Sequence, residues 1–414
     1  RRTSCCASSP TLASSARAPT APSGPLVGIR VLDLASVGPA VRATRILSDY
    51  GAEVVKVAPL ARAGAVQISP PAYAYSGGRL QRRVALDLKS AEGVEAFLAL
   101  VRDADVLVES FRPGVMDRLG LGADACHAVN PSLIYCSTSG FGATGPRKSW
   151  AGHDINYLGV SGFLHCSSRR ADGTPAIPGA TVADIAAGGM HAAMAILAAL
   201  AARRPDTTQR VATQQVTTQR VAPPASPAEP VTLDVSIADG ALAMMSLYAD
   251  EYLATKNSPG PGHYILTGKY AWYDVYRCAD GGFVTVGAIE PNFFAALCRG
   301  LGLEQFLGRQ YDDDAIDDMR AAFAEAFASR PRDEWVAELG PADCCVAPVL
   351  SIEEALADEQ YLARAAVCSA TTTSGESFGQ LAAVWAGTAS APEGGYQLPD
   401  PNDSALSELL VEAG

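Results

Sequence analysis

Three side chains in this sequence have the type and setting for acid–base chemistry: His153, Asp184 and Glu290. His153 follows Gly152, and a glycine there would let a ligand approach the backbone closely. Asp184 heads an apolar, helix-like run, where the helix dipole would keep its carboxylate ionised as a base or nucleophile. Glu290 ends an apolar, strand-like run before Pro291. Each position also suits a structural role at the start of a helix.

Common metal-binding fingerprints are missing from the chain, and the usual nucleotide fingerprint is missing from the loop after its first predicted strand. It has five histidines and ten cysteines but neither HExxH nor a CxxC pair, so we expect no metal site and reduced thiols in an intracellular protein. No GxGxxG follows the first predicted strand, where a dinucleotide-binding fold carries it, and no GxxxxGK[ST] occurs, which removes support for NAD and ATP. Glycine loops at residues 111–114 and 139–142 would hold a phosphate on their amides, with Arg112 adding charge. Plain turns are the alternative interpretation of both loops.

Composition narrows the choice of partners. The chain has 414 residues, is 48% hydrophobic and carries a formal net charge of −12. This length allows about two domains, and the acidic balance argues against a nucleic-acid partner. The longest apolar run, residues 185–202, contains His191 and indicates a buried helix, so we predict no membrane span.

Strand-like and helix-like runs alternate in the first half of the chain. Apolar runs typical of buried strands occupy residues 28–34, 52–57, 84–88, 105–109 and 132–137. Helix-like runs lie between them, at residues 41–50 and 91–103. This alternation predicts an α/β domain with a doubly wound parallel sheet. Further on, strands at 273–277 and 283–288 flank a turn, which predicts a hairpin in a smaller α+β domain.

Two stretches of biased composition mark the ends of the first domain. Residues 1–24 contain three arginines and no acid, so they form either a disordered or a transit-like leader. Residues 203–230 hold a hexapeptide, TTQRVA, that occurs twice, followed by four prolines. We interpret that stretch as an exposed linker and a domain boundary.

Six segments, in order over more than 300 residues, resemble the family III CoA-transferase (CaiB/BaiF) superfamily, and within it the α-methylacyl-CoA racemases. The segments are residues 28–34 (GIRVLDL), 86–89 (LDLK), 111–116 (FRPGVM), 152–157 (GHDINY), 286–291 (VGAIEP) and 345–350 (CVAPVL). The resemblance implies an interlocked homodimer. It implies a large CoA-binding nucleotide-fold domain at 25–202, a small α+β domain at 231–335, and a segment at 336–414 that returns to the large domain.

The same resemblance implies a set of site residues and a ligand. The ligand is an acyl-CoA thioester, so coenzyme A is part of the substrate and no separate cofactor is needed. His153 and Asp184 match the two acid/base residues, and Glu290 matches a carboxylate that pairs with the histidine of the other subunit. The matching CoA and substrate contacts are Leu86, Asp87, Leu88, Lys89, Arg112, Gly152, Asp154, Ile155, Asn156 and Tyr157.

These residue types suit the interconversion of (2R)- and (2S)-2-methylacyl-CoA. Removing a thioester α-proton needs a base on one face, and reversing the configuration needs an acid on the other. Amides near the Asp184 helix start or Gly152 would stabilise the enolate oxygen. Glu290 would fix the histidine tautomer and favour its charged form. The sequence therefore predicts an isomerase of the racemase type.

Two other functions stay open. In a CoA-transferase, Asp184 would attack the thioester and carry CoA as an aspartyl-CoA thioester to a second acid. The transferases of the group generally lack the histidine before the DINY-like run, which favours the racemase. A non-catalytic CoA-binding paralogue is the second alternative. We expect a cytoplasmic protein, or a mitochondrial or peroxisomal one if the leader is a targeting segment.

Two departures from the family pattern bear on the site. Racemases usually carry an arginine soon after the second strand, where this chain reads VAPL at 57–60. Ala187 interrupts the glycine run that follows the catalytic aspartate. The nearby arginines that could replace the missing CoA contact are Arg62, Arg79, Arg82 and Arg83.

Overall fold

The structure is a computed structural model that describes residues 24–35, 37–60, 73–74, 78–203, 230–383, 392, 394–399 and 404–412. The predicted leader, apart from Gly24, lies outside the described residues. So does the predicted linker with its repeated hexapeptide, apart from Arg203 and Pro230.

Six parallel strands form the main sheet, in the order β3-β2-β1-β4-β5-β6. The strands are β1 (Arg30–Asp33), β2 (Glu53–Ala58), β3 (Gln81–Ala85), β4 (Val106–Glu109), β5 (Ile134–Ser139) and β6 (Val231–Ser236). The order reverses between β1 and β4, and ligands of such sheets bind outside the carboxyl ends of the strands at that reversal. The predicted parallel α/β sheet is confirmed.

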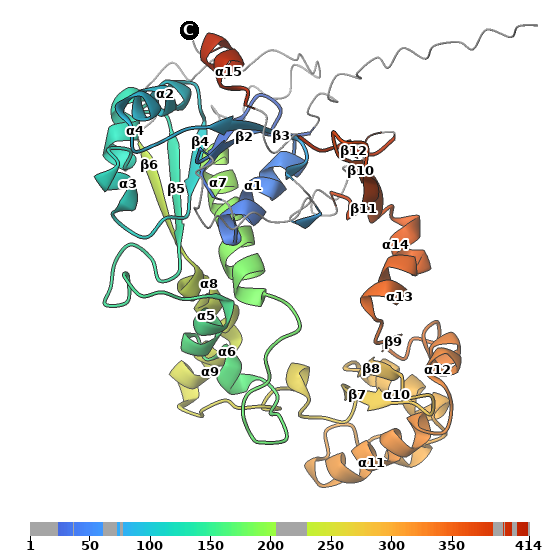
Figure 1. Ribbon diagram of the computed structural model, residues 1–414. Coiled ribbons are helices and arrows are strands. Elements are labelled where there is room, and N and C mark those ends of the chain that lie inside the picture. The colour runs from blue at the N-terminus through green and yellow to red at the C-terminus, as the bar shows by residue number, and fades with distance from the viewer. Residues whose placement is uncertain are drawn as a thin grey trace, which may run out of the picture.

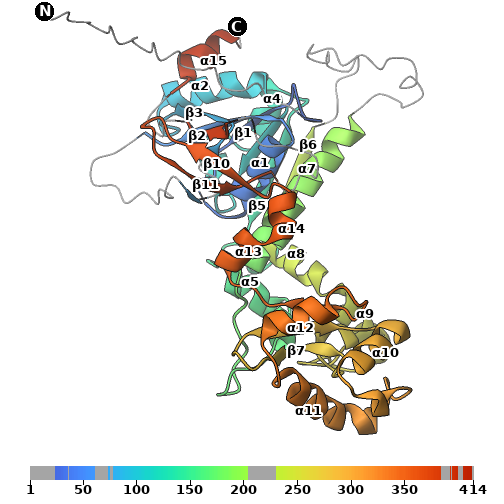
Figure 2. The ribbon, with the colours of Figure 1, turned by 90° about the vertical axis from the view of Figure 1, so that its right-hand side faces the viewer.

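Helices cover both faces of this sheet. One core joins Val31 and Ile134 of the sheet to α1 (Pro39–Asp49) and α7 (His191–Ala202). The other joins Leu32 and Leu107 to the helices on the opposite face. These helices are α2 (Ala91–Arg102), α4 (Ala123–Val129) and the C-terminal α15 (Leu406–Glu412), which lies beside α2 in Figure 2. Val31 and Leu32 face opposite ways because successive strand residues alternate, so a strand buried on both faces is apolar throughout.

Two strands differ from their predicted places. The run at 231–236 was expected in the small domain, but β6 pairs with β5 over its whole length. The interruption between Ala202 and Val231 is therefore an insertion within the large unit, between α7 and β6. The run predicted as a strand at 84–88 is β3, which ends at Ala85. There Asp87 accepts a hydrogen bond from the Lys89 amide, and this tight turn ends the strand before α2.

The long apolar run at 185–202 forms one continuous helix with an unusual first half. Residues Ala183–Met190 are the π-helix η2, and α7 continues from it. Among the described residues, this helix alone is long and apolar enough to cross a membrane by length and composition. Its inner side packs in the core through Ala192 and Ile196, as a core helix does, while Met194 on its outer side is 59% exposed.

Four helices lie at the carboxyl edge of the sheet, next to η2. They are α5 (Asp154–Val160), α6 (Phe163–Cys166), α8 (Ile237–Met244) and α9 (Ser246–Thr255). A compact core of Tyr157, Leu158, Ala187, Ile237 and Ala241 holds α5 and α8 against η2. These helices pack beside two of the three predicted acid–base residues, His153 and Asp184.

A smaller unit, formed by the chain between α9 and α13, lies apart from the main sheet (Figure 1). Its antiparallel sheet has the order β7-β8-β9, which confirms the predicted hairpin. Trp272, Phe323 and Phe327 centre its core. Its elements are β7 (Tyr273–Arg277), β8 (Phe283–Gly287), β9 (Val346–Pro348), α10 (Pro291–Gly300), α11 (Ile316–Phe327) and α12 (Arg332–Leu339), with short 3-10 turns at Ile265–Thr267, Glu304–Phe306 and Asp313–Ala315. Because β9 pairs with β8, the unit extends past residue 336, where the returning segment was expected to begin.

After β9 the chain returns to the large unit (Figures 1 and 2). It passes through α13 (Ile352–Ala357) and α14 (Glu359–Ala363) to a third sheet of β10 (Val367–Thr371), β11 (Ser377–Leu381) and β12 (Tyr396–Gln397). Buried Arg79 anchors this sheet: it donates to the Leu381 carbonyl, pairs with Asp49 at 3.3 Å and lies 4.1 Å from the Tyr396 ring centroid. The small unit is thus tied to the large one by two separate stretches of chain.

Candidate active site

Asp184 and the start of α5 meet at the carboxyl edge of the main sheet. The Asp184 amide donates a 2.8 Å hydrogen bond to Oδ1 of Asp154, which joins the first turn of η2 to the first turn of α5. His153 is the residue before α5, and its positive field acts to lower the pKa of Asp184. The structure therefore brings His153, Asp154 and Asp184 together from segments about thirty residues apart in the chain.

The Tyr157 ring explains why residues 140 and 152 are both glycines. The Tyr157 hydroxyl donates a 2.7 Å hydrogen bond to the Gly152 carbonyl. A Cβ on Gly152 would lie 2.8 Å from the Tyr157 ring, and one on Gly140 would lie 2.4 Å from its hydroxyl. We expected Gly152 to admit a ligand, whereas in this chain it makes room for an aromatic ring.

The remaining residues of the GHDINY run divide into buried supports and exposed groups. The backbone amide of His153 donates to Oδ1 of Asn156 at 3.0 Å, which caps the first turn of α5. Tyr157 is buried, and burial together with the Asp184 charge raises its pKa to about 12. His153 and Ile155 are exposed at the surface of the site. The contacts of these residues with CoA stay a prediction.

Glycines let three helices approach each other around Asp184. A Cβ on Gly188 would lie 2.6 Å from the Pro39 side chain, and a Cβ on Gly189 would lie 2.8 Å from Cβ of Arg42, so η2 packs directly on α1. On the other side, a Cβ on Gly240 of α8 would lie 2.3 Å from the Ala187 carbonyl oxygen. Ala187, which interrupts the glycine run, fits against α8 because the residue that faces it there is Gly240.

The Asp184 carboxylate is partly buried and has charges of both signs around it. Its side chain is 21% exposed, and Nη1 of Arg42 lies 4.0 Å from Oδ2 of Asp184. Burial raises the pKa of Asp184 and the neighbouring Asp154 charge raises it further, while Arg42 and His153 act in the opposite direction. The net pKa lies above the ordinary aspartate value, which suits a group that must both accept and return a proton.

The predicted CoA-binding residues after β3 and β4 lie at the same edge of the sheet, because parallel strands share one carboxyl edge. Leu86 is buried and Lys89 is exposed at the start of α2. Arg112 is exposed in the loop after β4. This loop is held by Glu109, whose buried carboxylate accepts a 2.7 Å hydrogen bond from the Phe111 amide and has a pKa raised by that burial.

The arginines proposed to replace the missing CoA contact have other surroundings. Arg79 is buried against the third sheet, so it is a structural residue. Arg82 pairs with Glu53 at 3.0 Å and with Glu408 at 3.1 Å. Arg83 is half-buried and its pKa is lowered by burial, with the Asp33 charge acting against that. Arg62 lies outside the described residues.

Glu290 stands apart from the other two predicted acid–base residues. It is the exposed residue before α10 in the small unit (Figure 1). Within the described part of one chain, no hydrogen bond or ion pair links it to His153 or Asp184. Its charge acts instead on Cys345, helping burial to raise the pKa of that thiol. The predicted pairing with a histidine of a second subunit stays a prediction.

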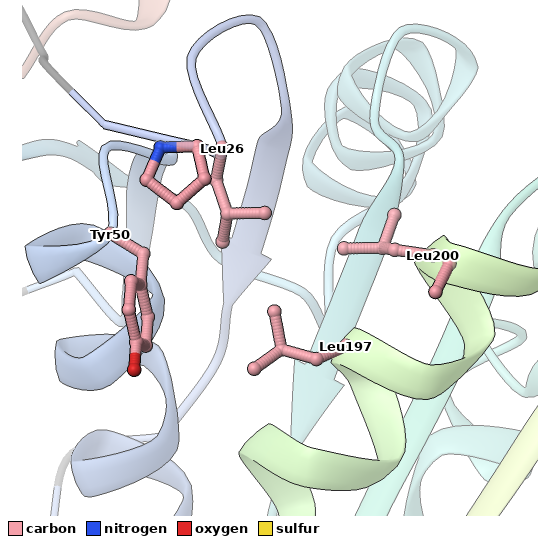
Figure 3. A pocket seen from close by; sticks show the side chains of 6 residues that line it. Leu26, Tyr50, Leu197 and Leu200 are labelled. Atoms are coloured by element: carbon pink, nitrogen blue, oxygen red, sulfur yellow. The ribbon is translucent and has the colours of Figure 1, made fainter. Parts of the chain in front are cut away.

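Two cavities lie in the part of the chain that the structure describes, and the first is remote from this site. One cavity has a volume of about 180 Å³ and is lined by Pro25, Leu26, Tyr50, Leu197, Leu200 and Ala201. Figure 3 shows these side chains. The apolar wall of this cavity lies at the amino ends of β1 and β2, on the opposite edge of the sheet from Asp184. A second cavity of about 260 Å³ lies between α6 and α9, and its lining includes His165, Cys166, Met245, Tyr248 and Tyr252. No group of three His, Cys, Asp or Glu side chains in the described ranges could hold a metal ion.

This fold and the gathered acid–base groups define an α/β enzyme with its site at the carboxyl edge of a doubly wound sheet. The chain belongs to the CoA-transferase family III, whose sequence model matches residues 26–221 and 229–402. It is 36% identical over 342 residues to the alpha-methylacyl-CoA racemase of Mus musculus, covering 82% of this chain and 81% of that protein. It is 31% identical over 364 residues to the acetyl-CoA:oxalate CoA-transferase of Acetobacter aceti, covering 84% and 86%. A solved CaiB/BaiF family protein from Brucella suis has a TM-score of 0.70 at 25% identity, covering 94% of this chain and all of that one. The resemblance found in the sequence is confirmed at the level of the family.

Proposed function

We propose that this enzyme racemises 2-methylacyl-CoA thioesters through an enolate. The observation that carries the proposal is the placement of His153 beside Asp184, at the start of α5 and in the first turn of η2. A histidine and a carboxylate are the pair that a two-base racemisation requires. The similarity to the mouse racemase over four-fifths of both chains supports the same reaction.

In the proposed reaction, one of the two groups removes the α-proton and the other returns a proton to the opposite face. The C–H bond breaks, its electron pair forms the enolate, and a new C–H bond forms with inverted configuration. The Asp184 amide already donates to Asp154, so the enolate oxygen would be stabilised by other amides at this helix start or by those near Gly152.

Coenzyme A would lie along the carboxyl edge of the sheet, where the loops after β3 and β4 present Lys89 and Arg112. These cations suit the phosphates of CoA. The acyl-CoA is the substrate, so the proposal requires no separate cofactor. The compartment in which the enzyme works stays a prediction.

We propose further that the enzyme is an interlocked homodimer. Large apolar side chains are exposed on the helices around the site, which is unusual for a surface facing water. They include Met190, Met194, Leu242, Met244, Leu247 and Leu253. A second copy would cover these side chains, and its small unit would bring Glu290 to the histidine. Attachment of the small unit at both ends suits interlocking, because each chain then encloses part of the other.

A CoA-transferase is the second candidate function. The 31% identity to the Acetobacter transferase favours it, and Asp184 would serve there as the nucleophile. In that reaction Asp184 attacks the donor thioester and releases the CoA thiolate, which leaves a mixed anhydride. The thiolate attacks the aspartyl carbonyl and releases the donor carboxylate, forming aspartyl-CoA. An acceptor carboxylate then attacks that thioester, and the released thiolate takes the acceptor acyl group from the new anhydride and frees Asp184. His153 has no role in those steps.

Proton exchange separates the two functions. A single-handed 2-methylacyl-CoA is incubated with the enzyme in heavy water, without an acceptor acid, and NMR follows the α-position. Racemisation predicts deuterium uptake with loss of handedness, and H153A should abolish both. No exchange, with CoA transfer to an added carboxylic acid, would overturn the racemase proposal in favour of the transferase. Tight CoA-thioester binding without either reaction would indicate a non-catalytic paralogue.

A further inference from the structure

Arg42 is a basic residue at an unfavourable place in its own helix. It is the fourth residue of α1, which begins at Pro39 and has no acidic residue in its first turn. A cation near a helix N-terminus is repelled by the helix dipole unless an anion faces it. The nearby anion is Asp184, 4.0 Å away, and this pairing brings together α1 and η2.

The position of the Arg42 side chain is fixed by two further contacts. Its Nη2 donates a 3.1 Å hydrogen bond to the hydroxyl of Thr181, just before η2. Its Cβ occupies the space that a side chain at position 189 would need, so Gly189 allows α1 to approach Asp184. The guanidinium group, 23% exposed, is thereby anchored at Thr181 with its other nitrogen toward the carboxylate.

We propose that Arg42 is a positioning residue for Asp184, which holds the carboxylate in place and favours its ionised form. The inference rests on the proposed role of Asp184 in the reaction, whereas nothing in the family resemblance assigned a role to Arg42. Thr181 and Gly189 support this role. Thr181 accepts a hydrogen bond that holds the guanidinium in place, and Gly189 leaves the space that Arg42 needs next to η2.

The other groups around Asp184 show why such a counter-charge matters. Burial and the Asp154 charge both raise the pKa of Asp184, so without Arg42 the carboxylate would stay protonated to a higher pH. His153 offsets these effects only when it carries a proton. The titratable groups on the elements packed against η2 are Arg42, Arg45 and Asp49 of α1, His153, Asp154 and Tyr157 at α5, His191 of α7, Asp234 of β6 and the exposed Asp239 of α8. Arg45 and Asp49 pair with each other, and Asp234 accepts from the Ala143 amide.

The first test measures the ionisation of Asp184 directly. The protein is labelled with ¹³C at aspartate carboxyls, the Asp184 signal is identified by its loss in D184N, and its titration is followed by NMR. In R42Q the titration midpoint of Asp184 should rise by about one pH unit. This is the lower end of the pKa shift that an adjacent opposite charge causes, because the side chains of Arg42 and Asp184 are both partly exposed. R42K should restore most of the shift. R299Q, which removes an exposed charge from α10, should leave the midpoint unchanged.

The second test follows the pH profile of kcat/KM for deuterium exchange. In R42Q the acid limb should move upward with the NMR midpoint, giving about a tenfold loss on that limb, while the high-pH plateau stays within threefold. T181V keeps Arg42 but removes its anchor, so it should shift the limb in the same direction by less. An unchanged NMR midpoint in R42Q, or a raised KM with an unmoved limb, would overturn the positioning role. Absence of exchange in the wild type would defeat the proposed reaction, whereas the NMR midpoint would still decide the role of Arg42.

Discussion

The two sides of the proposed catalytic machinery are built differently. Asp184 is partly buried between α1, α5 and α8, and its amide, its carboxylate and its glycine neighbours all have fixed contacts. Glu290 stands exposed before α10, in a unit that two stretches of chain tie to the large sheet. One chain therefore supplies the contacts on the Asp184 side by itself, whereas in the proposed dimer the Glu290 side would acquire its contacts from a second chain.

The largest expected effect comes from the Asp184 side. D184N and H153A should each lower the racemisation rate by about 10³-fold, the usual contribution of a general acid or base. The melting temperature should change little, because neither substitution removes the backbone amide of residue 184 that donates to Asp154. Chiral analysis of the product measures the rate and calorimetry measures the stability. Near-wild-type turnover in either variant would remove that residue from the reaction.

The next effect tests the close packing around Asp184. G240A places a methyl group 2.3 Å from the Ala187 carbonyl oxygen, and backbone at that distance must shift. Alanine normally stabilises a helix relative to glycine, but this overlap should lower the free energy of unfolding by about 2 kcal/mol. The control is G260A, where a Cβ meets no atom within 4 Å. Equal stability of the two variants in urea would show that α8 is free to move.

A smaller effect tests the exposed side. E290Q should slow the reaction about tenfold, equivalent to about 1.4 kcal/mol, because its proposed role is to bias the partner histidine. Co-expression of H153A with E290Q should give mixed dimers in which one site has both native residues. Their exchange rate should approach half that of the wild type. A mixed dimer no faster than E290Q would show that Glu290 does not act across the interface.

The smallest effect concerns the ring beside His153. Y157F removes the hydroxyl that donates to the Gly152 carbonyl and should lower the free energy of unfolding by about 1 kcal/mol. The rate should fall only a few-fold, since His153 keeps its bond to Asn156. Loss of activity comparable to H153A would instead give the hydroxyl a part in the chemistry.

The sequence predicted the main sheet well because each strand has its own signal. Strands such as β1 and β4 are buried on both faces and read as short apolar runs. β6 was assigned to the wrong unit because the Thr/Gln/Pro-rich stretch before it has the composition of a domain linker. The pairing of β6 with β5 is a long-range contact that composition does not record.

The proximity of His153 and Asp184 in one candidate site was predictable because residue type and motif coincide there, and their roles stay predictions. The supports of the site were not predictable, since they depend on packing between distant elements. Gly152 makes room for the Tyr157 ring, and Gly240 makes room for the Ala187 backbone on another helix. Arg42 was missed altogether, although a cation in the first turn of an otherwise acid-free helix was a signal in the sequence.

The two ends of the insertion between α7 and β6 are places where the molecule can be labelled. Ala202 ends a helix and Val231 begins a parallel strand, so the chain leaves and re-enters the sheet at its amino edge. Asp184 lies at the opposite edge. A fluorophore or affinity tag attached at Arg203 or Pro230 would therefore report on assembly from the side of the sheet away from Asp184. Two differently labelled preparations would then reveal subunit exchange while catalysis proceeds.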